Sequence, residues 1–66
     1  MNIEIREVGE PAILQELCPS PKFVMPRIGD KVRFHTYMKG GFFQVSDIVH
    51  DYQTMTILVF VIKIED

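Results

Sequence analysis

The strongest constraint on the fold is an uncharged apolar run near the end of the chain. Residues 57–62 read Ile-Leu-Val-Phe-Val-Ile and contain no glycine or proline. Because β-branched and aromatic residues favour strands, this composition predicts a strand over residues 55–64. Side chains of a strand alternate between the two sides of its sheet, so this strand places apolar groups on both sides. Each side therefore requires cover, from the chain itself or from a partner.

The chain is too short to shelter much apolar surface alone. Its 66 residues predict a single domain over residues 1–66. A domain of this size hides only about 60 % of its extended-chain surface on folding. The single cysteine, Cys18, excludes an intramolecular disulfide. Small domains without disulfides or metals often rely on oligomerisation, so the sequence favours a homo-oligomer or a bound protein partner.

No pattern for export or membrane insertion is present. The first six residues, Met-Asn-Ile-Glu-Ile-Arg, lack the basic region and apolar stretch of a secretory signal. The run at 57–62 is far shorter than the about 20 residues that a membrane-spanning helix requires. We therefore expect a cytoplasmic protein without a membrane contact.

Residue alternation predicts two further strands before the middle of the chain. Residues 2–8 alternate apolar and charged side chains, which is typical of a half-buried strand. Residues 31–37 alternate basic and apolar side chains in the same way. Gly40 and Gly41 follow, and glycines tolerate the positive φ angles of a two-residue hairpin turn. The chain is expected to reverse direction there.

The returning strand is expected over residues 42–49. Its apolar positions change parity, and a bulge near Ser46 and Asp47 would bring Ile48 back to the inner side. Residues 50–54 then form the next reversal. Together with the strand at 55–64, these segments predict a three-stranded antiparallel meander.

Residues 12–17 are ambiguous. Ile13, Leu14 and Leu17 have helical spacing, and Pro11 suits the first position of a helix, so we expect a short amino-terminal helical segment. A short strand containing Ile13 and Leu14 is the alternative, since six residues are too few for periodicity to decide. The two prolines between residues 18 and 22 predict a connecting loop.

Several short antiparallel strands in so small a chain predict an all-β fold that closes into a small barrel, because closure removes exposed sheet edges. The order Pro26-x-x-Gly29-Asp30-x-Val32, hairpin, returning strand and final strand resembles the compact SH3-like barrels of many bacterial and phage proteins. This resemblance covers about residues 26–64. It implies an SH3-like antiparallel barrel and no particular activity.

In such a barrel the final strand has an inner and an outer side. Ile57, Val59 and Val61 would line the interior. The outer side would then carry apolar residues that need cover, namely Leu58, Phe60 and Ile62, with Phe42 and Tyr37 as aromatic anchors.

Two kinds of cover are open for these residues. The amino-terminal segment would lie across them through three side chains, Ile13, Leu14 and Leu17; otherwise they form an interface with a second copy or another protein. The sequence therefore predicts a small protein-interaction module, self-associating or adaptor-like.

Nucleic-acid binding is the alternative function. Residues 22–39 carry five bases and one acid, whereas the whole chain has a net charge of −2. Lys31, Arg33 and Lys39 with Tyr37 combine cations and an aromatic ring, as surfaces that bind single-stranded nucleic acid do. In the competing interpretation these cations form the solvated side of a strand. The net negative charge of the whole chain favours this second interpretation, because nucleic-acid-binding domains are usually basic.

Catalysis and metal binding are not indicated. His35 and His50, with Asp47, Asp51 and Cys18, show no metal-ligand spacing, and the His50-Asp51 pair suits a turn. Cys18 has no base in a recognisable arrangement, and the glycine pair lacks the lysine of a phosphate loop. We therefore expect no enzyme activity, no cofactor and no metal site.

Overall fold

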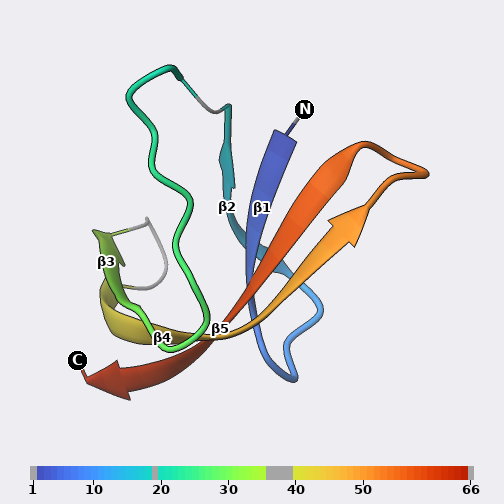
Figure 1. The fold of residues 1–66 in the computed structure, drawn as a ribbon. Helices are drawn as coiled ribbons and strands as arrows, with labels where there is room; N and C mark the ends of the chain where they lie inside the picture. Colours follow the sequence, from blue (N-terminus) through green and yellow to red (C-terminus); the bar gives the residue numbers. More distant parts are fainter. Residues whose placement is uncertain (1, 19, 36–39, 66) are drawn as a thin grey trace.

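The computed structural model describes residues 2–18, 20–35 and 40–65 as one five-stranded sheet (Figure 1). The described residues contain strands and no helix, which confirms the all-β prediction. The strands are β1 (Asn2–Glu7), β2 (Ile13–Leu17), β3 (Lys31–His35), β4 (Gly40–Asp51) and β5 (Thr56–Glu65). Their order across the sheet is β2-β1-β5-β4-β3.

The apolar run forms β5, the central strand of the sheet. It lies between β1 and β4. The β3-β4-β5 meander is antiparallel, as expected, and β1 pairs with β2 antiparallel. Against the expectation of a purely antiparallel sheet, β1 and β5 are parallel, with Ile3 opposite Ile57. A parallel pair requires a long crossover, and all of β2, β3 and β4 lie between these two strands in the chain.

A bulge in β4 lies where the sequence predicts it. Val45 pairs with Val61 and Asp47 pairs with Phe60, which leaves Ser46 as the extra residue. The Ser46 hydroxyl donates a hydrogen bond to the Phe60 carbonyl at 3.3 Å. The parity change returns Ile48 to the inner side, where it packs on the core.

The first hairpin prediction is wrong in its position. Gly40 and Gly41 belong to β4, where they pair with His35 and Phe34, and Gly41 has a φ of 115°. The connection between β3 and β4, residues 36–39, lies outside the described residues. The second reversal is as expected: the Asp51 carboxylate accepts the backbone N–H groups of Gln53 at 3.0 Å and Thr54 at 3.3 Å.

The predicted amino-terminal helix is wrong, and the alternative of a strand is correct. Residues 13–17 form β2, with Leu17 opposite Ile3. Gly9 has a φ of 84°, which lets the chain turn back along β1. The hydrogen bonds of a helix of one or two turns do not offset the unfavourable free energy of helix nucleation. As a strand, the same segment forms a ladder of hydrogen bonds to β1.

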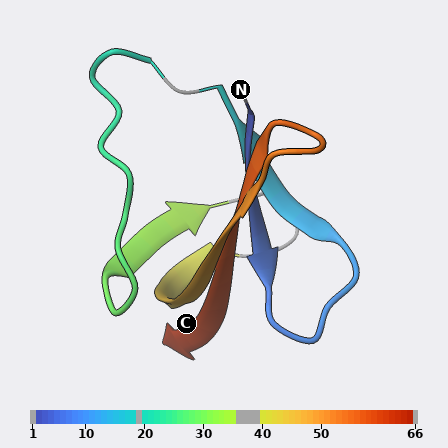
Figure 2. The same cartoon turned by 45° about the vertical axis from the view of Figure 1, so that its right-hand side comes forward.

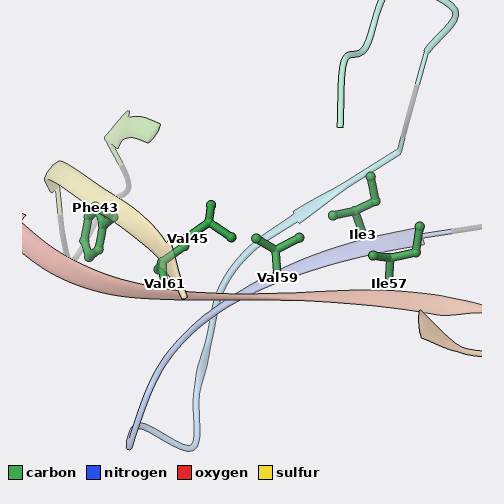
Figure 3. Close-up of a cluster of buried hydrophobic side chains, with 6 residues drawn as sticks. All are labelled: Ile3, Phe43, Val45, Ile57, Val59 and Val61. Atoms are coloured by element: carbon green, nitrogen blue, oxygen red, sulfur yellow. The ribbon is translucent and has the colours of Figure 1, made fainter. Parts of the chain in front are cut away.

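One side of the sheet, which we call the inner face, carries the core. Its buried side chains are Ile3, Phe43, Val45, Ile57, Val59 and Val61, and Figure 3 shows Ile3, Ile57 and Val59 on the same side of β1 and β5. The segment between β2 and β3 runs past this side of the sheet (Figures 1 and 2). Phe23 and Met25 of that segment pack against the core, while Val24 between them is 84 % exposed.

The sheet has two end strands, β2 and β3. Each has one hydrogen-bonded neighbour among the described residues. Hydrogen bonds between β2 and β3, which would close a barrel, are not part of the described sheet. Within the same residues, no helix has the length and apolarity needed to cross a membrane.

Candidate functional site: the outer patch and the inner cavity

The opposite side of the sheet, the outer face, carries an apolar surface over β4 and β5. We name it the outer patch; its residues are Phe42, Val49, Leu58, Phe60 and Ile62. Val49 pairs with Leu58 across the two strands, which places both side chains on one side of the sheet. Leu58 and Phe60 are half-buried, whereas Ile62 is 49 % exposed. Four of the five residues predicted for an interface lie here, and the fifth, Tyr37, lies outside the described residues.

Charged side chains border the outer patch. Glu4 and Arg6 of β1 lie beside Leu58 and Phe60 in the parallel register. The Arg6 guanidinium donates two hydrogen bonds to one Glu4 carboxylate oxygen, at 2.8 and 3.1 Å. Asp47 faces Phe60 from the other neighbour, β4. An apolar surface with a polar border is typical of a protein interaction site.

The amino-terminal segment does not cover the outer patch. Leu14 and Leu17 pack against the core on the inner face. Ile13 pairs with Arg6 at the margin of the sheet and is 39 % exposed. Because β2 extends the sheet beyond β1, its side chains do not lie across the outer side of β5, and the alternative of cover from these residues is wrong.

The predicted nucleic-acid residues are only partly described. Lys31 and Arg33 are exposed on β3, an end strand, and share the parity that faces outward. The Arg33 guanidinium lies over the Phe42 ring, 5.4 Å from its centroid. Lys39 and Tyr37 lie outside the described residues, so the structure brings together two of the four predicted residues.

The described residues hold no group of three metal-ligating side chains. Cys18 is exposed, and its Sγ lies 3.8 Å from the Asn2 Oδ1, to which it donates. The His50 ring stacks on Tyr52 with centroids 6.3 Å apart, and Asp51 caps the turn. Each of these side chains has a local structural role.

A cavity on the inner face was not predicted from the sequence. We name it the inner cavity; its volume is about 320 Å³. Its walls come from β1, β2, β3, β5 and the segment between β2 and β3. The lining residues are Ile3, Ile5, Gln15, Leu17, Phe23, Val24, Pro26, Val32, Arg33 and Val59. Segments so far apart in the chain meet only in the folded sheet, so local sequence patterns do not predict this cavity.

The inner cavity is too large to be sealed and empty. At about 24 cal/mol per Å³, a sealed and empty void of 320 Å³ would cost roughly 8 kcal/mol. A domain of 66 residues has a total stability of only about 3–10 kcal/mol. The protein would not tolerate such a void, so the cavity must admit solvent or another occupant.

Comparisons with known proteins give no match for this chain among family models, curated proteins or solved structures.

Proposed function

We propose that the protein is a non-catalytic interaction module that associates through the outer patch, first of all with a second copy of itself. The observation that supports this proposal is the uncovered apolar surface of β4 and β5, in which Ile62 remains 49 % exposed. Removing this surface from water favours association, and two-fold symmetry pairs the same patch on both copies. An adaptor role would use the same residues for a different protein.

We further propose that the strands curl into a small SH3-like barrel. The Pro26–Val32 sequence that carries the resemblance forms a tight turn, in which the Arg27 N–H donates to Asp30 Oδ2 at 2.8 Å. Gly29 supplies a φ of 95° at this turn. The antiparallel β3-β4-β5 meander also supports the comparison. The parallel β1–β5 pair departs from it, so the comparison applies to residues 26–64.

Static light scattering over a dilution series tests the association. We expect a mass at least twice the 7.7 kDa of one chain at high concentration, falling towards 7.7 kDa on dilution. Added salt should change this mass little, because the outer patch is apolar. A mass of one chain up to millimolar concentration would contradict self-association and leave a different protein as the partner.

A second candidate function is binding of single-stranded nucleic acid at the end strand β3. It is favoured by the exposed pair Lys31 and Arg33 beside the Phe42 ring, because cations bind phosphates and rings stack on bases. We expect binding of a labelled oligothymidylate at low salt to weaken steeply as salt rises.

The double substitution Lys31→Ala and Arg33→Ala should weaken this binding at least tenfold. Lys22→Ala with Arg27→Ala removes the same charge from the exposed segment before β3 and serves as the control. Equal weakening by both pairs would indicate unspecific charge attraction, and no binding at low salt would exclude this function.

A further inference from the structure

We propose that two copies pair through the outer patch about a two-fold axis that runs along β5, so that Arg6 of each copy faces Asp47 of the other. This arrangement rests on the self-association proposed above and specifies how the two copies are oriented. β5 is the third of the five strands, so the axis divides the sheet evenly. Rotation about this axis lays β1 of one copy on β4 of the other, and β2 on β3.

One row of side chains across the outer face has a cation at one end and an anion at the other. In the parallel register, Arg6 of β1 lies beside Phe60 of β5. In the antiparallel register, Asp47 of β4 lies beside the same Phe60. The adjacent Ile48 and Val59 pack in the core, so this row points outward. A half-turn about β5 exchanges the two ends of the row, which places each guanidinium over a carboxylate of the second copy.

Both charged groups have hydrogen-bonding capacity for this contact. Asp47 is exposed, and its Oδ1 accepts the Ile48 N–H at 2.9 Å. An ionised carboxylate accepts several further hydrogen bonds. The Arg6 guanidinium donates to Glu4 through Nε and Nη2, and its side chain is 32 % exposed. Because a guanidinium carries five N–H donors, it can bind a second carboxylate while it holds Glu4.

The two margins of the outer face carry opposite charge, which favours the same axis. At the β3 margin Lys31 and Arg33 are exposed, whereas at the β2 margin Glu16 is exposed and pairs with Glu4. The axis along β5 sets the basic margin of each copy against the acidic margin of the other. An axis across the strands would set the cations of β3 against each other. Complementary charges fix the orientation of a complex more than its affinity, so the apolar patch remains the source of most of the association.

Sheet twist limits the closest contact to the middle strands. Two sheets that pack face to face keep their strands within about 30° of one another. Twist turns the end strands away from the facing sheet, so the closest contact falls on β1, β5 and β4. The row of Arg6, Phe60 and Asp47 therefore lies at the centre of the interface, and the charged margins act over a longer distance.

Two charge-reversed variants and their mixture test this arrangement by static light scattering. Arg6→Glu sets carboxylates against carboxylates at both ends of the row, and Asp47→Arg sets cations against cations. Each variant alone should associate at least tenfold more weakly than the parent, because like charges opposed in an interface disfavour association. An equal mixture should recover association to within about threefold of the parent, since each reversed charge then faces the other.

Lys22→Glu is the matched control for these variants. It reverses the charge of an exposed residue in the segment between β2 and β3, outside the outer patch. This variant alone should associate as the parent does. Its mixture with Asp47→Arg should not show the recovery expected for the complementary pair.

A nitroxide label on the turn between β4 and β5 reports the orientation without reversing a charge. Gln53→Cys, in a Cys18→Ser background, carries the label on an exposed turn residue. With the axis along β5, the turns of both copies lie at the same end of the dimer. Unlabelled ¹⁵N chains mixed with labelled chains should then lose amide signal at residues 52–55. An axis across the strands would move the loss to residues 62–64.

The outcomes separate this arrangement from the association itself. If the parent associates and Phe60→Asp prevents it, but the mixture of Arg6→Glu and Asp47→Arg does not recover association, the axis is wrong and the interface stands. Signal loss at residues 62–64 instead of 52–55 excludes the axis as well. A parent that keeps the mass of one chain overturns both proposals. If a reversed variant does not fold, the labelled chain decides alone.

Discussion

Replacing Phe43 by alanine is expected to lower the free energy of unfolding by about 3–5 kcal/mol, a large part of the stability of the domain. Phe43 is fully buried on β4 and is among the largest side chains of the core. Truncating a buried phenylalanine to alanine costs about 3–5 kcal/mol, since the lost transfer free energy adds to the cost of the void. That loss is comparable to the about 3–10 kcal/mol expected for the whole domain. Urea titration followed by circular dichroism, at a concentration too low for association, measures the change.

Phe42→Ala is the matched control for this prediction. The two phenylalanines are neighbours on β4 but point to opposite sides, and Phe42 is 38 % exposed. Its truncation removes a partly exposed ring and the contact with Arg33, so about 1 kcal/mol is expected. Equal urea midpoints for the two variants would show that the inner and outer faces are assigned wrongly.

Phe60→Asp is expected to reduce self-association more than a hundredfold. Phe60 lies at the centre of the outer patch, and a carboxylate there would be buried without a new partner when two copies meet. An uncompensated buried charge costs about 3–5 kcal/mol, which exceeds two factors of ten in affinity. Asp47 faces position 60 across the strands and adds like-charge repulsion. Light scattering of the folded variant should give the mass of one chain.

The control for this prediction is Met55→Asp, which introduces the same charge at the turn between β4 and β5. Met55 is 53 % exposed and has a φ of 57°, a conformation that aspartate tolerates better than most residues. This variant should keep the mass of the parent. If Phe60→Asp stays folded and also keeps the parent's mass, the outer patch is not the interface.

Local patterns in the sequence were sufficient for most of the strands. The apolar run at 57–62 predicted a strand because β-branched and aromatic residues favour strands, whereas its central position in the sheet was not predicted. The parity change between Val45 and Ile48 predicted the bulge, since each extra residue exchanges the two sides of a strand. Asp51 predicted its turn through a hydrogen bond that spans only two or three residues. All of these features depend on neighbours in the chain.

The errors concern segments whose structure depends on distant partners. Residues 13–17 have helical spacing, yet they form a strand because the free edge of β1 lies within reach after Gly9. The position of the first hairpin was also wrong, since Gly40 and Gly41 act as strand residues opposite β3. Propensity is a weak guide when another strand offers a complete ladder of hydrogen bonds.

The candidate sites divide in the same way. The alternation within β5 was enough to assign Leu58, Phe60 and Ile62 to one side, because a strand has a period of two wherever it lies. The strand order β2-β1-β5-β4-β3 decided two further points. It decided which side of the sheet the amino-terminal segment covers, and whether a cavity remains between that side and the segment before β3. Strand order follows from contacts between residues far apart in the chain, whose closure entropy and packing are set only by the folded molecule.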